Sequence, residues 1–220
     1  MSHLTKKQQQ TRTTGAQHHV DAVIIDTGCA NISSLKFALE RLGYRISVSK
    51  QYEHICHAAK VFLPGVGSAA FAMQQVEQRQ LTQVIQSLTQ PVLGICLGMQ
   101  LMTKHSIEND TDTSCLGLID TNISRINVTD TALRLPHMGW NTLTKISDSP
   151  LFEQISEQDY FYFVHSYCAP ITPFTLAQCQ YGQNFSASLQ ANNFYGVQFH
   201  PERSGQAGAT LLRNFMELCQ

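Results

Sequence analysis

A cysteine between two glycines, at the end of a short apolar strand, is the feature that most constrains this chain. The segment reads Gly94-Ile95-Cys96-Leu97-Gly98 and follows the apolar residues 91–93. In a Gly-x-nucleophile-x-Gly turn the nucleophile lies on a sharp strand-to-helix bend, and a side chain at either glycine would clash. A helix beginning near Leu97 would direct its free N–H groups and its positive end toward the sulfur, which favours the thiolate. The pattern predicts a nucleophilic Cys96, and a nucleophile needs partners.

Length, charge and cysteine usage limit what kind of protein can carry this turn. The 220 residues suit one α/β domain with a sizeable core. The 15 basic residues nearly balance the 16 acidic ones, and no Lys/Arg cluster follows the first fifteen positions, so neither nucleic acid nor a membrane surface is an expected partner. Seven scattered cysteines without a C-x-x-C pair indicate a reducing compartment and no metal site. With no apolar run of about 18 residues, we expect a cytoplasmic protein without cofactors.

The first half of the chain alternates between strand and helix patterns. Residues 1–19 are polar and are predicted to be a disordered tail, which leaves 20–220 as one domain. Asn31 is a candidate helix cap, and Gly43 is expected to end the helix that follows it. The predicted strands are 20–25, 44–48, 61–63 and 91–95. One predicted helix follows Asn31, and three others span 68–78, 81–89 and 97–105. This order favours a parallel sheet with both faces covered and sites beyond the C-terminal strand ends, where Asn31, Gly65 and Cys96 fall.

The second half has short strand patterns that fit antiparallel hairpins. They cover 116–126, 141–146, 160–165, 175–180, 185–189 and 194–199, and an amphipathic helix spans 207–218. The predicted fold class is therefore α/β, with a mostly parallel central sheet, helices on both faces and an antiparallel C-terminal extension.

A histidine and a carboxylate follow the last predicted strand. His200-Pro201-Glu202 can present an imidazole and a carboxylate from one stiff turn. A base for a cysteine nucleophile needs a third group to orient it, so His200 is the candidate acid and base and Glu202 its orienting partner.

Backbone N–H groups near the cysteine are candidates for an oxyanion hole. Pro64-Gly65-Val66-Gly67 follows a buried strand, and its glycines allow an N–H to turn toward a neighbouring site. We expect the N–H of Gly65 or Val66, together with that of Leu97, to stabilise a tetrahedral oxyanion.

Several segments together make the chain similar to a known family. It resembles the class I, triad-type glutamine amidotransferases through Pro64–Gly67, Gly94–Gln100 and Gln198–Glu202. More narrowly it is similar to the glutaminase subunits of imidazole glycerol phosphate synthases. The segments that narrow the resemblance are Asp26–Asn31, Leu135–Asn141, Tyr162–Tyr167 and Pro201–Gly205. The family often has tyrosine at the position of Thr27 and glycine at that of Ala30, so this loop departs slightly from the pattern.

The resemblance implies a fold, an activity and a set of site residues. It implies a class I glutamine amidotransferase-like (flavodoxin-like) fold. The implied activity is hydrolysis of L-glutamine, with Cys96 as nucleophile, His200 as base and acid, and Glu202 as orienting carboxylate. The glutamine-binding residues that it implies are Gln100, Glu108, His165, Ser166 and Tyr167. A zwitterionic substrate needs a carboxylate for its ammonium group and amides for its own carboxylate.

The resemblance also implies a partner protein. Ammonia would pass to a separate cyclase subunit, a (β/α)₈ barrel, which forms imidazole glycerol phosphate and an aminoimidazole carboxamide ribotide in histidine biosynthesis. The residues implied at this heterodimer contact are Asn31, Ser34, Trp140, Asn141 and Arg203. From sequence alone, Asn31 and Ser34 also fit a helix cap, Trp140 a core position, and Arg203 a solvated surface.

Three other functions remain open from the sequence. The chain could be an amidotransferase subunit for another acceptor, a regulatory binding protein without catalysis, or a cysteine peptidase of similar fold. The segments that are similar to imidazole glycerol phosphate synthase subunits argue against another acceptor. Intact Cys96, His200 and Glu202 argue against a binding protein without catalysis. Peptide cleavage without glutamine turnover would support the third.

Overall fold

The computed structural model describes residues 20–28, 30–108 and 111–220. The predicted tail at 1–19 lies outside the described residues. The helices are α1 (Ile32–Arg41), α2 (Tyr52–Cys56), α3 (Ala69–Gln78), α4 (Thr82–Gln86), α5 (Leu97–Leu101) and α6 (Gly205–Glu217). Short 3₁₀ turns, η1 (Pro150–Phe152) and η2 (Pro201–Arg203), occur in the second half. The strands are β1 (Ala22–Ile25), β2 (Ile46–Ser49), β3 (Val61–Gly65), β4 (Val92–Cys96), β5 (Thr103–Glu108), β6 (Thr111–Ser114), β7 (Ile119–Arg125), β8 (His137–Thr142), β9 (Tyr160–His165), β10 (Tyr167–Cys168), β11 (Thr175–Tyr181), β12 (Gln183–Ala191) and β13 (Phe194–Val197).

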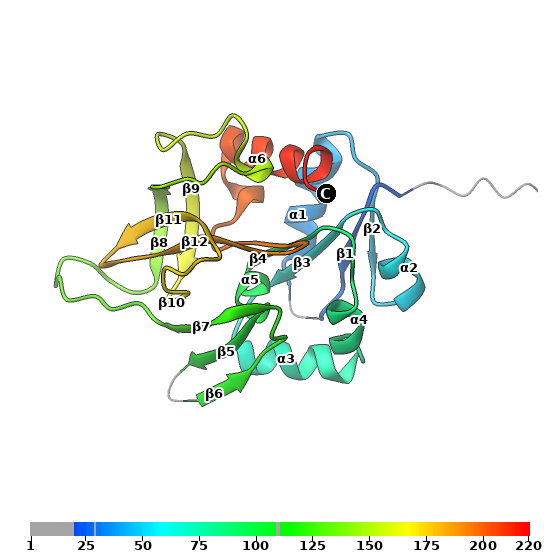
Figure 1. The fold of residues 1–220 in the computed structure, drawn as a ribbon, viewed down its shortest axis with the longest axis horizontal. Coiled ribbons are helices and arrows are strands. Elements are labelled where there is room, and N and C mark those ends of the chain that lie inside the picture. The colour runs from blue at the N-terminus through cyan, green and yellow to red at the C-terminus, as the bar shows by residue number, and fades with distance from the viewer. Residues whose placement is uncertain (1–19, 29, 109–110) are drawn as a thin grey trace, which may run out of the picture.

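A seven-stranded sheet runs through the middle of the molecule (Figure 1). Its strand order is β11-β12-β13-β4-β3-β1-β2. The strands from β13 to β2 pair in parallel, whereas β12 pairs antiparallel with both β11 and β13. The fold is therefore mixed α/β with a mostly parallel centre and an antiparallel extension, which confirms the predicted fold class.

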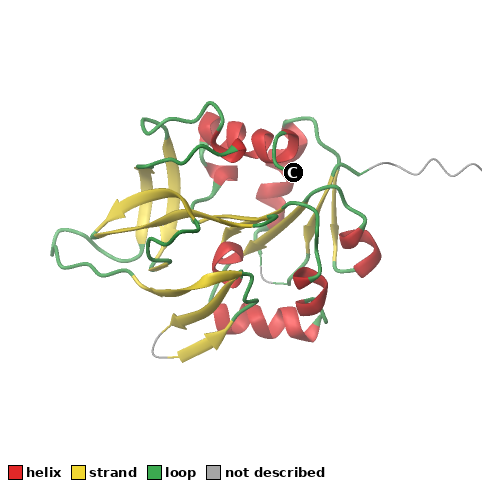
Figure 2. Ribbon diagram, viewed as in Figure 1, coloured by secondary structure: helices red, strands yellow, loops and turns green. Residues whose placement is uncertain are grey.

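Helices cover both faces of the parallel strands (Figure 2). Successive residues of a strand point to opposite faces, so Ile24 and Phe62 pack with helices α1 and α6, while Ile25 and Leu63 pack with helices α2 to α5. Strands β1, β3, β4 and β13 are buried at every residue. Continuous apolar strands of this kind are typical of a sheet with both faces covered.

Two smaller sheets flank the central one. One has the order β10-β7-β5-β6, and the other is the ribbon of β8 and β9. The sequence correctly predicted strands over most of β7, β9, β11, β12 and β13, but placed the strand of β8 too late, at 141–146. It did not predict α2, β5, β6 or β10.

The helix predicted over 97–105 is wrong beyond α5, which ends at Leu101. Thr103 and His105 lie instead on β5, which pairs in parallel with β7. The Thr103 hydroxyl donates to the carbonyl of Gln100 at 2.7 Å, a bond that satisfies a last-turn acceptor and ends the helix. Asn31 does occupy the N-cap position of α1, but its side chain makes no capping hydrogen bond.

The C-terminal ends of β3, β4 and β13 meet at one edge of the sheet. Gly65 pairs with Cys96, and Val197 pairs with Ile95. This register brings the glycine turn and the cysteine turn together, as the strand-helix order predicts, and it places the segment that leads to His200 beside them. Within the described residues, no helix has the length and apolar character needed to cross a membrane.

Candidate active site

Cys96 lies on a strained turn between β4 and α5. Its φ is 54° and its ψ is −113°, a left-handed backbone that a residue with a side chain adopts only at a cost of about 1–3 kcal/mol. A Cβ on Gly98 would lie 1.7 Å from the carbonyl oxygen of Leu63, and one on Gly94 would lie 2.8 Å from the nitrogen of Met99. Both glycines are therefore sterically required, as the spacing predicts.

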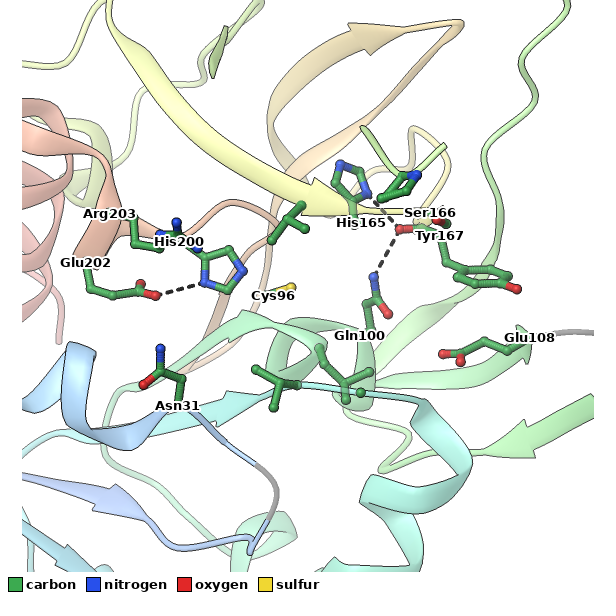
Figure 3. A pocket seen from close by; sticks show the side chains of 15 residues that line it. Asn31, Cys96, Gln100, Glu108, His165, Ser166, Tyr167, His200, Glu202 and Arg203 are labelled. Carbon is green, nitrogen blue, oxygen red and sulfur yellow. Dashed lines mark hydrogen bonds and ion pairs between the residues drawn. The ribbon is translucent and has the colours of Figure 1, made fainter. Parts of the chain in front are cut away.

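His200 and Glu202 form a buried pair beside the cysteine. His200 Nδ1 lies 2.8 Å from Glu202 Oε1, and the ring lies between this carboxylate and the Cys96 sulfur (Figure 3). Burial lowers the pKa of His200, but the contacts with Cys96 and Glu202 outweigh it and raise the pKa to about 10. Because Nδ1–H donates to the carboxylate, Nε2 is the atom left for the sulfur or a substrate, and it has no hydrogen bond of ordinary geometry to a described residue.

The charged imidazole of His200 lies beside the sulfur, where it would stabilise a thiolate. Helix α5 has only five residues. Its dipole at Cys96 is therefore weaker than the dipole of the longer helix predicted over 97–105 would be. The arrangement can move a proton between a sulfur and an imidazole, while a carboxylate fixes the ring tautomer. It has the parts of a cysteine-based acyl-transfer site.

A cavity of about 420 Å³ opens beside these residues and is large enough for an amino acid. Twelve of the predicted site residues line it, namely Asn31, Val66, Cys96, Leu97, Gln100, Glu108, His165, Ser166, Tyr167, His200, Glu202 and Arg203. Gly65 lies on an adjoining recess with Asn31 and His200 rather than on the main cavity. Within the described ranges, no group of three or more His, Cys, Asp or Glu side chains is arranged to hold a metal ion.

Two polar side chains stand on the cavity wall away from the sulfur (Figure 3). Glu108, on β5, accepts from the Ala69 N–H at 3.1 Å and from the Ser106 hydroxyl at 3.3 Å. Gln100 is buried, and its Nε2 donates to the Tyr167 carbonyl at 3.0 Å and to Gln198 Oε1 at 2.8 Å. Both hydrogens of the Gln100 amide nitrogen are therefore donated inside the protein, and only its Oε1 could bind a ligand.

The profile of the glutamine amidotransferase class-I family matches residues 23–219. The chain belongs to this family. The match includes the cysteine turn, the His200–Glu202 pair and the residues that line the cavity.

Relatives of this amidotransferase share about half of its residues. It is 52% identical to imidazole glycerol phosphate synthase subunit HisH of Colwellia psychrerythraea over 209 residues, which cover 89% of this chain and 92% of the relative. It is also 52% identical to subunit HisH of Escherichia coli over 199 residues, which cover 90% of this chain and all of the relative.

Solved structures share the fold at low sequence identity. A protein from Thermoplasma acidophilum described as a putative GMP synthase subunit has a TM-score of 0.69 at 16% identity, covering 92% of this chain and 94% of that one. A crystal structure of a glutamine amidotransferase has a TM-score of 0.68 at 17% identity, covering 90% and 98%. These likenesses show the class I amidotransferase fold.

The His165–Tyr167 segment of the amidotransferase uses the histidine internally. His165 Nδ1 lies 2.9 Å from the Tyr167 carbonyl, and its Nε2 lies 3.1 Å from His137 Nδ1. Burial lowers the pKa of His165 to about 3, so the ring is neutral at physiological pH. His165 borders the cavity, but its ring nitrogens face protein groups.

Two of the predicted partner residues, Trp140 and Arg203, pack against the ring of Tyr162. The Arg203 guanidinium lies 4.2 Å from the centre of the Tyr162 ring, and the rings of Tyr162 and Trp140 are 5.9 Å apart, so these three form one cluster. Trp140 is 54% exposed, which excludes a core position. The Asn141 amide donates to the Gln180 carbonyl at 3.0 Å. Asn31 borders the cavity, and Ser34 is half-buried on α1.

Two buried residues near the amidotransferase site were not predicted. Gln198 lies 3.8 Å from the Cys96 sulfur, and His137 contacts His165. The sequence does carry a signal for Gln198, because a glutamine inside the apolar run 196–199 is a polar group that must find a buried partner. His137 has no comparable signal, because it lies outside the strands and helices that the sequence predicts.

Proposed function

We propose that this chain is the glutaminase subunit of an imidazole glycerol phosphate synthase. The observation that carries the proposal is the alignment of Cys96, His200 and Glu202 at the edge of a cavity of amino-acid size. The names of the HisH relatives support the particular synthase. Residues 20–220 would form one amidotransferase domain that works in the cytoplasm.

The first half of the proposed reaction forms a thioester. The Cys96 thiolate attacks the side-chain amide carbon of glutamine, and the carbonyl π electrons move to the oxygen. The N–H of Leu97 and that of Gly65 or Val66 stabilise this oxyanion, each by about 3 kcal/mol of barrier. His200 gives its proton to the departing nitrogen, the C–N bond breaks, and ammonia leaves.

The second half releases glutamate. His200, now neutral, accepts a proton from water, whose oxygen attacks the thioester carbon. The C–S bond breaks, the thiolate returns, and the imidazolium is restored. Glu202 keeps Nδ1 protonated throughout, so Nε2 always faces the reacting atoms.

The proposed substrate contacts follow from the cavity wall. The Glu108 carboxylate would take the ammonium group of glutamine, while Gln100, Ser166 and Tyr167 would bound the rest of the amino acid together with the edge of His165. No cofactor or metal enters this scheme.

The proposed partner is a cyclase subunit with a (β/α)₈ barrel, which would receive the ammonia in a heterodimer. Trp140 and Arg203 support this through their exposed aromatic cluster, and Asn31 through its place at the cavity. Ser34 and Asn141 complete the proposed contact. A glutaminase that released ammonia without an acceptor would waste glutamine, so we expect low activity alone and stimulation by the ligand-bound partner.

Reconstitution with the cyclase subunit, in the presence of its phosphorylated ribotide substrate, tests the function. A Cys96→Ala variant should lose the glutamine-dependent reaction and keep the reaction that uses free ammonia, because only the nucleophile is removed. Product formation with each nitrogen source gives the measurement. Loss of both reactions, or of neither, would contradict the assignment, and full glutaminase activity of the isolated chain would contradict the gating.

A further inference from the structure

A fully buried glutamine lies beside the sulfur of the proposed nucleophile. Gln198 follows β13, two residues before His200, and its side chain has no exposed area. Its Nε2 lies 3.8 Å from Cys96 Sγ, within hydrogen-bonding range of a sulfur acceptor. A buried amide in this position is either a donor to the sulfur or, with its ends exchanged, a carbonyl that repels it.

The surrounding hydrogen bonds decide which end faces the sulfur. The Tyr167 backbone carbonyl can only accept, so the Gln100 amide must turn its NH₂ group toward it, at 3.0 Å. The second hydrogen of that NH₂ group meets Gln198 at 2.8 Å and needs an acceptor, which is Oε1. The Gln198 NH₂ group is therefore the end that faces Cys96, and the direction follows from a backbone carbonyl rather than from an arbitrary amide assignment.

The same carbonyl also contacts His165, which in turn contacts His137. His165 Nδ1 donates to it at 2.9 Å, which leaves His165 Nε2 as the acceptor for His137 Nδ1–H at 3.1 Å. His137 Nε2 then faces the Asn141 Nδ2 group at 3.4 Å. Burial lowers the pKa of His137 to about 4, so this chain of donors persists at physiological pH. The carbonyl that orients both amides is thus tied to ribbon β8–β9.

We propose that Gln198 is a further catalytic residue, whose amide N–H donates to the Cys96 sulfur and stabilises its thiolate. Gln100 and the Tyr167 carbonyl act as positioning groups for that amide. A thiolate accepts a hydrogen bond more strongly than a neutral thiol, so the contact favours ionisation. The proposal depends on the proposed function in one respect, namely that Cys96 is the nucleophile.

The pH dependence of Cys96 alkylation by iodoacetamide tests the proposal without glutamine. Mass spectrometry of the Cys96 peptide separates this thiol from the others. In Gln198→Leu the midpoint of alkylation should move to higher pH by about one unit, because one hydrogen bond to a charged group is lost. The titratable groups around the cavity are unchanged in this variant: Glu108, His165, Tyr167, His200, Glu202 and Arg203.

A second variant and a control keep the test decisive. Gln198→Glu preserves the shape and the acceptor for Gln100 but places a carboxylate oxygen at the sulfur, so the midpoint should move further than in Gln198→Leu. Gln190→Leu removes a glutamine on β12 whose amide donates to the nearby Asn192 carbonyl, and it should leave the midpoint unchanged. An unchanged midpoint in either folded Gln198 variant would overturn the proposal.

The glutaminase assay of the complex adds an independent readout. In Gln198→Leu, kcat should fall about tenfold with little change in KM, because the lost contact is to the sulfur and not to bound glutamine. A shifted alkylation midpoint in a chain that never hydrolyses glutamine would sink the proposed function and leave the thiolate contact standing.

Discussion

At the scale of single residues, the site depends on keeping one imidazole charged among several buried ones. His137 and His165 are neutral because burial lowers the pKa of each, to about 4 and about 3. For His200 burial acts in the same direction, but Cys96 and Glu202 reverse it. The difference between these rings lies in their neighbours, since all three are buried.

The raised pKa of His200 predicts a pH-dependent stability. The folded-state pKa of about 10 lies above the ordinary value of 6.5, so this stabilisation is fully present below about pH 6.5 and is lost as the pH rises through 10. Glu202→Gln removes a cause of the shift. The wild-type free energy of unfolding should therefore fall more steeply between pH 7 and pH 10 than that of the variant, as measured by urea titration. Parallel pH profiles would contradict the assigned charge.

The residues of the site also differ in whether the sequence could predict them. The cysteine turn, the His-Pro-Glu turn and the glycine turn are local patterns, so Cys96, His200 and Gly65 could be chosen from the sequence. The partners of Gln198 and His137 come from other elements, and the sequence does not indicate which pairs meet. Nor does it indicate that the Asn141 amide donates to the Gln180 carbonyl.

At the scale of elements, the site depends on how closely α5 lies on the strands below it. The backbone of Gly98 approaches the Leu63 carbonyl on β3, and Gly196 on β13 leaves room for the side chain of Met99. These contacts fix where the first turn of α5 begins, and that turn carries the Leu97 N–H. The close approach thus holds a proposed oxyanion donor in place.

The close approach of α5 to the strands predicts that alanine destabilises the fold more at Gly98 than at Gly43. Gly98→Ala should cost about 3 kcal/mol of unfolding free energy, because the new Cβ would overlap the Leu63 carbonyl and the strand must shift. Gly43→Ala, after helix α1, meets no atom within 4 Å and carries only the strain of its φ of +96°, so it should cost about 1 kcal/mol. Thermal and urea unfolding measure both, and equal costs would contradict the packing argument.

The elements that the sequence missed have a common physical cause. In the central sheet the apolar runs are long and bounded by glycine or polar turns, so β1, β3 and β4 were predictable. Strand β5 continues directly from helix α5, and its pairing partner β7 lies farther along the chain. Helical periodicity carries no information about such a partner, and the predicted helix ran on through Thr103 to residue 105.

At the scale of the whole molecule, an exposed aromatic cluster lies close to the candidate active site. Trp140 and Tyr162 lie opposite each other on β8 and β9, and Arg203 covers the Tyr162 ring from η2. Arg203 also lines the cavity, next to Glu202 in the sequence. A partner that buried this cluster would contact the turn that carries the proposed catalytic pair.

Removing the Trp140 side chain should therefore have a large effect on assembly with the proposed partner. Trp140→Ala should weaken binding of the cyclase subunit about 30-fold, because a central aromatic anchor contributes about 2 kcal/mol or more. Calorimetric titration measures the affinity. Tyr52→Ala, on α2, removes an aromatic side chain of similar exposure, 55% against 54%, and should bind as the wild type does. Equal weakening by both variants would exclude Trp140 from the interface.

The strand order has a consequence for the time at which reactivity arises. Cys96 and His200 lie on segments more than one hundred residues apart, and β13 reaches β4 only after the chain has passed through both smaller sheets. A nascent polypeptide that has emerged as far as α5 holds the Cys96 thiol but not yet the His200 imidazole. The reactive sulfur is thus created late, by the same strand pairing that closes the sheet, so unfinished chains carry an ordinary thiol.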